Sequence, residues 1–186
     1  MRTQKVDPEN VDLKLFETFS KLGYDGASME LLAQATGLKK ASLYHRFPNG
    51  KIEMAQQALS IVEEWIQQNI VAVSANKKIK PETRLKKAVA AIDELYNGGA
   101  NNCLLRTLTV GTDAEAFKEN VSSCFNLLAD GFTDIAIDLG LSPKAARQQA
   151  KLINLLVQGS LVLAGATGDK GYFKNSLAKI PALLEA

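Results

Sequence analysis

The chain has 186 residues, of which 46% are hydrophobic and 23% charged, so it can bury one substantial core and is too apolar to be disordered throughout. A net charge of +2 does not by itself indicate a polyanionic partner, and two cysteines are too few for a disulfide scaffold or a zinc site. No uninterrupted apolar run approaches the roughly 20 residues that span a bilayer, and the polar start "MRTQKVDPENVD" is unlike a signal peptide. We therefore expect a cytoplasmic protein with no membrane partner.

Apolar residues recur with helical spacing along the chain and no segment alternates with period two, which predicts an all-helical fold. Asp7 and Pro8 predict the N-cap and first residue of a helix that ends at Gly23. Ser28 is expected to cap a short second helix that ends near Gly37. A third short helix is expected from about residue 39 to residue 47.

The remainder of the chain is expected to form longer helices. Pro48-Asn49-Gly50 interrupts the chain, and further helices are predicted at about residues 51–74, 81–97, 103–110, 114–139, 143–166 and 172–184. Three short helices followed by about six longer ones predict two domains. These are a small N-terminal module over residues 1–50 and a larger helical body over residues 51–186.

Charge is distributed unevenly along the chain. Residues 1–51 hold eight Lys/Arg and six Asp/Glu, whereas residues 52–186 hold fourteen of each. The window from Leu31 to Ile52 contains no Asp or Glu, yet its stretch "KKASLYHRFPNGK" carries four Lys/Arg side chains and the only histidine of the chain. A surface cleared of acids is suited to a polyanionic partner because no carboxylate would repel phosphates.

The second and third predicted helices, joined by "ATGL", have the dimensions of a helix-turn-helix. Leu43 and Phe47 are four residues apart on the third helix and must face the core. At about 100° per residue, Ala41 and His45 then point away from that core. The exposed side of the third helix is therefore expected to be small, polar and cationic.

Each residue type on this surface suits DNA. Ala41 and Ser42 are small enough to let the helix approach base edges in the major groove. The lysines can neutralise phosphates, the tyrosine and histidine can hydrogen-bond phosphate oxygens, and helix N-termini attract phosphate. The candidate DNA-binding residues are Ser28, Lys39, Lys40, Ala41, Ser42, Tyr44, His45 and Lys51.

The same residues are also compatible with functions that do not involve DNA. A cationic stretch is commonly a solvated face, and a Tyr or His on a short helix commonly packs against its neighbours. A small helical enzyme would have to use His45, with Ser42 three residues before it, on the exposed face of a short helix. No phosphate loop, dinucleotide fingerprint or metalloprotease motif is present. A helical adaptor would leave the acid-free window unexplained.

The segment "GYDGASMELLAQATGLKKASLYHRFPNGK" (residues 23–51) resembles the DNA-binding signature of TetR-family repressors. The elements of that signature match in order at Gly23-Tyr24, Ser28, Leu32-Ala33, Gly37, Leu43-Tyr44, Phe47 and Lys51. The extra glycine before the lysine resembles the LmrA/YxaF-type branch. Two positions depart from the pattern: Ala27 stands where many members carry Thr, and Lys39 replaces the common capping Ser.

The resemblance implies a homodimer that binds double-stranded operator DNA, represses transcription, and releases its operator when a small molecule binds the C-terminal body. It assigns DNA binding to residues 1–50, and ligand sensing and dimerisation to residues 51–186. We expect no cofactor, no metal and no enzymatic activity. An activator or a co-repressed variant is the alternative within the family. In the family's pattern the last two long helices form the dimer interface, which places it at residues 143–184. An ordinary core helix within one chain is the alternative for this apolar segment.

The resemblance places an effector pocket among the helices from residue 51 to about residue 166. An apolar or aromatic effector is expected, and the candidate lining residues are Trp65, Tyr96, Phe117, Phe125 and Phe132. Aromatic residues at helical spacing fit an ordinary core equally. Cys103 and Cys124 could form a thiol sensor or be buried, unreactive thiols. A reactive thiol needs a basic neighbour that lowers its pKa, and the basic residue closest in sequence to either cysteine is Arg106, three residues after Cys103.

Overall fold

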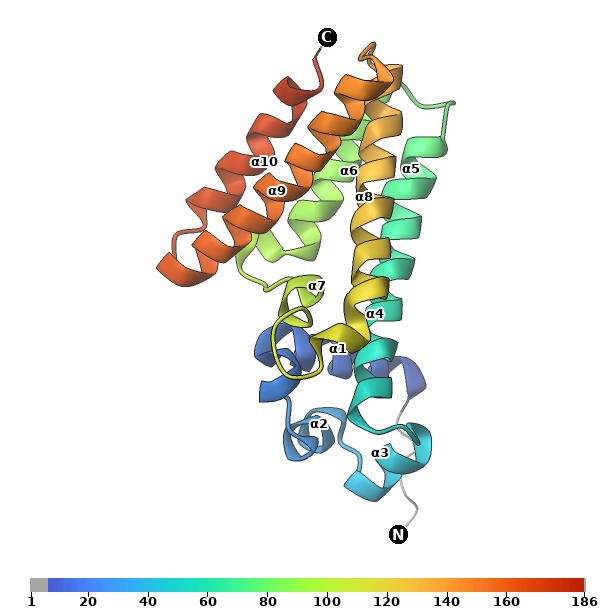
Figure 1. Cartoon of the computed structure of the whole chain (residues 1–186), viewed down its shortest axis with the longest axis vertical. Coiled ribbons are helices and arrows are strands. Elements are labelled where there is room, and N and C mark those ends of the chain that lie inside the picture. The colour runs from blue at the N-terminus through green and yellow to red at the C-terminus, as the bar shows by residue number, and fades with distance from the viewer. Residues whose placement is uncertain (1–6, 186) are drawn as a thin grey trace. The chain divides into compact units, whose positions relative to one another are not determined.

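The computed structural model describes residues 7–185, and every regular element in this range is helical (Figure 1). In chain order the elements are α1 (Pro8–Gly26), α2 (Met29–Thr36), α3 (Lys40–Arg46), α4 (Lys51–Ile66), η1 (Gln67–Val71), α5 (Ala72–Ala75), α6 (Pro81–Leu95), η2 (Asn97–Gly99), α7 (Leu104–Thr107), η3 (Ala114–Phe117), α8 (Lys118–Asp138), α9 (Pro143–Thr167) and α10 (Gly171–Leu183). The predicted all-helical fold class is confirmed. Residues 1–6 of the predicted N-terminal module lie outside the described range.

The chain forms two compact units. The first contains the residues up to Glu63 together with Leu104–Val121, and the second contains Glu64–Cys103 together with the residues from Ser122 onward. The first turns of α4 and the segment Leu104–Val121 thus belong to the same compact unit as the three N-terminal helices. The predicted functional division at residue 50 stays a prediction.

Helix α1 begins as predicted but does not end at the predicted glycine. The Asp7 carboxylate accepts a hydrogen bond from the Glu9 backbone N–H at 3.2 Å, and Pro8 is the first helical residue. Gly23 has φ +69° and ψ −179°, a combination that is essentially restricted to glycine, and the chain then forms one more turn to Gly26. The consequence is a kinked end that presents Tyr24 to the interior of the first unit.

Helices α2 and α3 form the predicted helix-turn-helix. The Ser28 hydroxyl accepts a hydrogen bond from the Leu31 backbone N–H at 3.3 Å, which is the predicted N-cap of α2. Gly37 ends α2 in the left-handed conformation, with φ +68°. Lys39 precedes α3 without a side-chain capping hydrogen bond, as expected for a residue that replaces a capping serine.

The predicted long helix after Gly50 contains a feature that its residue pattern did not reveal. Helices α4, η1 and α5 follow one another from Lys51 to Ala75, and η1 is a π-helical stretch in which the Ala72 N–H bonds to the Gln67 carbonyl, five residues back. The buried side chains before, within and after it recur every four residues, at Val62, Ile66, Ile70 and Ser74. Four residues overshoot a 3.6-residue turn by about 40°, so a wider turn keeps these side chains on one face.

Helix α8 packs closely against this π-helical stretch. A Cβ at Gly131 would lie 2.5 Å from the Ile70 Cγ2 atom and 3.5 Å from the Ile70 carbonyl oxygen. Glycine at position 131 therefore permits the approach of the two helices.

A buried arginine ties three parts of the second unit together. Arg84 is 2% exposed, and its guanidinium donates to the carbonyls of Ile79 and Ser74 and, at 2.7 Å, to the Asp138 carboxylate. Lys77 also pairs with Asp138. The hydrogen bonds from Lys77 and Arg84 hold the pKa of the Asp138 carboxyl below its usual value. This network fixes the loop between α5 and α6 to the end of α8.

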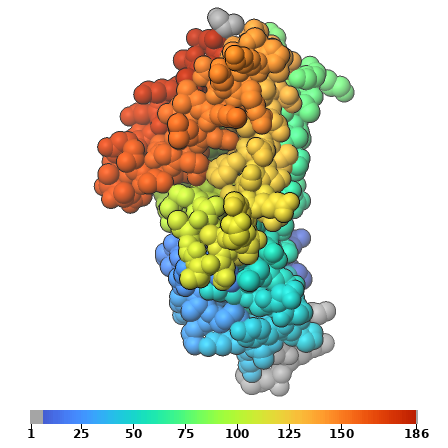
Figure 2. Space-filling model, in the orientation of Figure 1, coloured from blue at the N-terminus to red at the C-terminus, as the bar shows by residue number. Residues whose placement is uncertain are grey.

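Helices α9 and α10 lie side by side in the second unit (Figure 1), and both are visible at its surface (Figure 2). The predicted cap of α9 is confirmed, because the Ser142 hydroxyl accepts from the Ala145 backbone N–H at 3.3 Å. One side of α9 carries Ile153, Val157 and Leu161, all buried within the chain.

The opposite side of α9 is apolar and exposed. Leu155 is 67% exposed, and Val162 and Leu163 are each 45% exposed. Gly159 lies between them, and a Cβ placed there would meet open space. By length and composition alone α9 is apolar enough to cross a membrane, a property that core helices of soluble proteins share.

Candidate nucleic-acid interface

Helix α3 presents the predicted face to solvent. Leu43 is fully buried and Phe47 is 5% exposed, so the two predicted core residues anchor the helix. The side chains that the sequence assigns to the DNA face are exposed at Ala41, Ser42, Tyr44 and His45. The helix therefore combines an apolar inner side with an outer side that is small and polar. Contact of these four exposed side chains with DNA stays a prediction.

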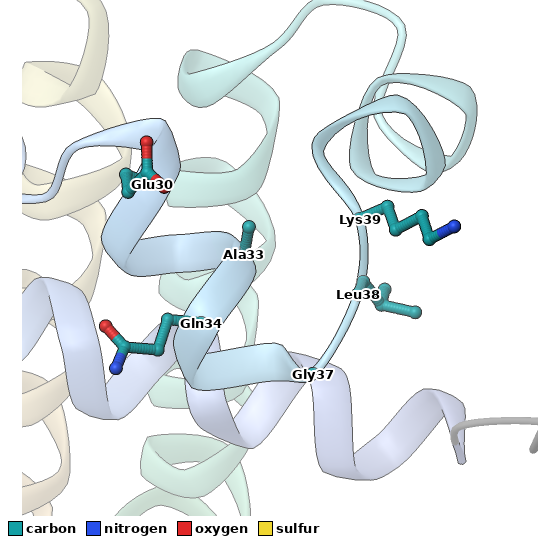
Figure 3. Close-up of a pocket in the computed structure, with 6 residues that line it drawn as sticks. All are labelled: Glu30, Ala33, Gln34, Gly37, Leu38 and Lys39. Carbon is teal, nitrogen blue, oxygen red and sulfur yellow. The ribbon is translucent and has the colours of Figure 1, made fainter.

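The connection between α2 and α3 borders an open hollow of about 540 Å³. Its lining residues are Glu30, Ala33, Gln34, Gly37, Leu38 and Lys39. Leu38 and Lys39 project to the same side of the connection (Figure 3). The hollow is shallow and bordered by one acidic and one basic side chain, so it suits contact with a large partner better than enclosure of a small molecule.

Two of the cations in this region are paired with carboxylates. Lys40 Nζ lies 2.7 Å from Glu30 Oε2, and this contact lowers the pKa of the Glu30 carboxyl. Arg46 pairs with Asp12 of α1 at 2.8 Å and also donates to the Pro8 carbonyl at 3.2 Å. The window without Asp or Glu in the sequence is therefore contacted in the fold by two carboxylates from outside it, Glu30 and Asp12. Arg46 holds α3 against α1.

The remaining predicted contacts occupy the starts of helices. Lys39 is exposed just before α3. Ser28 uses its oxygen to cap α2, which leaves its O–H free to donate. Lys51, the first residue of α4, donates to the Tyr24 carbonyl at 3.0 Å, and its Nζ lies 4.1 Å from the centre of the Tyr24 ring. Lys51 thus already has an intramolecular role besides the predicted contact with phosphate.

Tyr24 is the centre of an aromatic cluster that the residue pattern did not predict. Its ring lies 6.3 Å from the Phe19 ring, nearly parallel to it, and 5.2 Å from the Phe117 ring. Burial, followed by the Asp113 carboxylate, raises the pKa of Tyr24 to about 12. Phe117 was predicted to line an effector pocket, whereas the structure places it, fully buried, in the first unit beside Tyr24. Its pocket role stays a prediction that this packing does not support.

The other predicted pocket residues lie in the second unit. Trp65 and Phe125 are half-buried, and Phe132 is fully buried. Tyr96 packs edge to face on Phe173 at 5.8 Å, and its hydroxyl donates to Cys103 Sγ at 3.2 Å. Burial, with a further contribution from Cys103, raises the pKa of Tyr96 well above its usual value. The structure thus gives Tyr96 a polar partner inside an apolar region.

The chain offers little for other chemistry within residues 7–185. Both thiols, Cys103 and Cys124, are buried. No group of three or more His, Cys, Asp or Glu side chains in this range could hold a metal ion. His45 lies on the exposed side of α3.

Comparison with known proteins points to one family. Residues 15–58 match the model for bacterial regulatory proteins of the tetR family. The chain is 26% identical over 179 residues to YxaF of Bacillus subtilis (strain 168), an uncharacterized HTH-type transcriptional regulator, covering 92% of this chain and 93% of that one. It is 22% identical over 176 residues to the HTH-type transcriptional regulator LmrA of the same organism, covering 90% of each. The crystal structure of a TetR transcriptional regulator from Legionella pneumophila has the same fold, with a TM-score of 0.82, 22% identity and 98% coverage of both chains.

Proposed function

We propose that this chain, which belongs to the TetR family of helix-turn-helix transcriptional regulators, is a homodimeric repressor that leaves its operator when a small molecule binds its second unit. The family is non-enzymatic, which excludes a small helical enzyme using His45. DNA-binding transcriptional regulation is thus established at the level of the family. The repressor activity, the assembly and the effector are the proposal.

The observation that carries the proposal is the two-sided character of α3. Leu43 and Phe47 hold the helix against the core of the first unit, and on the opposite side the small side chain of Ala41 leaves room for close approach. A recognition helix needs this arrangement because its backbone must approach the floor of the major groove. Ser28 and Lys51, at the starts of α2 and α4, would contact the phosphates on either side.

The exposed apolar side of α9 supports a homodimer. Leu155, Val162 and Leu163 would cost solvation free energy in an isolated subunit, and Gly159 between them allows a second helix to approach closely. A second copy of α9 and α10 is the partner that the family pattern supplies. A symmetric dimer places two recognition helices on successive turns of one DNA face, which a single seven-residue helix cannot match in affinity.

The proposed effector binds the second unit and shifts the population of two conformations. It binds more tightly to a conformation in which the two recognition helices no longer match successive major grooves, so operator affinity falls. The buried aromatic residues Tyr96 and Phe132 of the second unit favour an apolar or aromatic effector. As a DNA-bound regulator of this family the protein would act in the cytoplasm.

Selection of DNA from a random pool tests this proposal. The protein should enrich a short, nearly palindromic sequence, and its affinity should fall steeply with salt because phosphate contacts release counterions. Light scattering should give twice the 20.1 kDa chain mass. In a reporter strain, deletion of the gene should raise transcription from the selected operator. A decrease on deletion would instead indicate the activator alternative, and failure to enrich any sequence would contradict the proposal.

A further inference from the structure

One hydrogen-bonded pair joins the end of α1 to a residue 87 positions later in the chain. Thr112 donates its backbone N–H to Asp25 Oδ2 at 3.0 Å and its hydroxyl to Asp25 Oδ1 at 2.7 Å. These two hydrogen bonds favour the charged carboxylate and lower the pKa of Asp25. We name this pair the latch.

The backbone beside Thr112 is adapted to the latch. Gly111 has φ +120°, and a Cβ at that position would lie 2.5 Å from Asp25 Oδ2. A side chain there would therefore strain the backbone and displace the carboxylate as well. The latch therefore needs Asp25 as the acceptor, Thr112 as the donor and the absence of a side chain at Gly111.

The latch is one end of a longer contact between the kinked end of α1 and the segment Leu104–Val121. Thr107 donates its hydroxyl to the Phe19 carbonyl at 3.2 Å, and its own carbonyl faces Gly23. Phe117 then packs on Tyr24 from the same segment. The segment thus contacts the last two turns of α1 at several points within the first unit.

The end of α1 is joined to the start of α2 through the chain and to the start of α4 through a hydrogen bond. Asp25 precedes the N-cap Ser28 of α2 by three residues. The preceding residue, Tyr24, accepts the hydrogen bond of Lys51, the first residue of α4. A displacement of this turn would change the spacing between Ser28 and Lys51, the two helix starts assigned to phosphate contacts.

We propose that Asp25 is a positioning residue for operator binding, acting through its latch to Thr112. This inference rests on the proposed DNA-binding function. The latch fixes the end of α1 and hence the spacing between the starts of α2 and α4. Fit to an operator requires that fixed spacing, whereas binding to random DNA depends mainly on the number of cations. Loss of the latch therefore lowers operator affinity and leaves random-DNA affinity unchanged.

Two substitutions test the latch in the full-length protein. Thr112→Val removes the hydroxyl donor at nearly constant shape, and Asp25→Asn removes the carboxylate. Thr112→Ser keeps both donors, and Thr109→Val removes a hydroxyl on the same segment that bonds only locally, to the Arg106 carbonyl at 2.8 Å. The wild type first selects its operator from random duplexes. Affinities for that operator and for random duplex DNA are then measured with the melting temperature of each variant.

The latch predicts about a tenfold loss of operator affinity for Thr112→Val and for Asp25→Asn, because a hydrogen bond to a charged group is lost. The double variant should lose about as much as the more affected single variant, since both changes act on the same pair of residues. Random-DNA affinity should stay near the wild-type value for Thr112→Val and should not fall for Asp25→Asn. The melting temperature of both variants should fall by no more than a few degrees, as expected for one lost hydrogen bond in a chain of this size. All measurements on Thr112→Ser and Thr109→Val should stay near the wild-type values. Removal of the Asp25 charge by itself favours DNA binding, so a fall in the operator affinity of Asp25→Asn would have to come from the lost latch.

Unchanged operator affinity in both variants would overturn the positioning role. A parallel fall of operator affinity, random-DNA affinity and melting temperature would also overturn it, because it would show a purely structural contact. A wild-type protein that selects no DNA would refute the proposed function before any variant is measured, so the two failures are distinguishable.

Discussion

Lys51 Nζ lies above the ring of Tyr24 and donates a hydrogen bond to the backbone carbonyl of the same residue. A single ammonium group thus joins the start of α4 to the kinked end of α1. An ammonium has three donors, and the carbonyl uses one of them. The same lysine can therefore stabilise the first unit and still approach a phosphate.

Lys51→Ala should consequently affect both stability and DNA binding. We expect a loss of about 1–2 kcal/mol in the free energy of unfolding from the hydrogen bond and the cation–π contact. Affinity should weaken for random DNA and at least as much for the operator, and the salt dependence should flatten by about one unit, as for one lost phosphate contact. Lys118→Ala, at the first residue of α8 in the same unit, is the charge-matched control. A changed sequence preference with an unchanged salt slope would place Lys51 away from the DNA backbone.

Ala41 and Leu43 should respond in opposite ways to substitution. Ala41→Leu places a bulky side chain on the exposed side of α3 and should keep the fold while costing several kcal/mol of operator affinity, within the roughly 4–10 kcal/mol that separates specific from non-specific binding. Leu43→Ala leaves a cavity at a fully buried site and should cost about 2–5 kcal/mol of stability. Thermal melting and operator titration of both variants provide the measurement. Unfolding by Ala41→Leu would show that the assignment of the faces is wrong.

Leu155→Glu should prevent dimerisation without unfolding the subunit. Leu155 is 67% exposed in the single chain, so a carboxylate there is solvated in the monomer and buried only on association. We expect light scattering to give the single-chain mass at micromolar concentration. Lys86→Glu on α6, an exposed site on a different helix, should remain dimeric. Leu161→Glu is a poorer test because Leu161 faces the core of its own chain and its substitution should unfold the protein. A dimeric Leu155→Glu variant would place the interface elsewhere.

Asp138 should make the stability of the second unit depend on pH in the acidic range. Its pKa is lowered in the folded state by Lys77 and Arg84 from the usual 3.8, so its stabilisation is complete above that value and is lost as the pH falls through the lowered folded-state pKa. Asp138→Asn should lower the free energy of unfolding at neutral pH by about 1–2 kcal/mol, because Arg84 loses a charged acceptor. The variant should also lose less stability than the wild type on acidification below about pH 4. Asp134→Asn, an exposed site one turn earlier, should behave like the wild type in denaturant titrations at several pH values.

Local signals in the sequence were sufficient for the all-helical fold class and for the character of α3, whereas the helix predicted at about residues 103–110 is only α7 (Leu104–Thr107). Ser28 caps its helix within three residues, and Leu43 follows from helical periodicity, so both are readable from neighbouring letters. The latch could not be read in this way, because Thr112 and Asp25 are joined only through tertiary structure. Phe117 was placed with the effector residues for the same reason: its position in the chain did not reveal that it packs on Tyr24.

The close approach of Gly131 to the π-helical turn has a consequence for the history of the protein. Ile70 belongs to the π-helical stretch, and its side chain occupies the space that a Cβ at position 131 would need. Position 70 and position 131 should therefore vary together among relatives. Lineages with alanine or serine at position 131 should carry a residue smaller than Ile70, or should lack one residue between positions 67 and 71. The deletion of that residue and the loss of the glycine would then mark the same evolutionary branches.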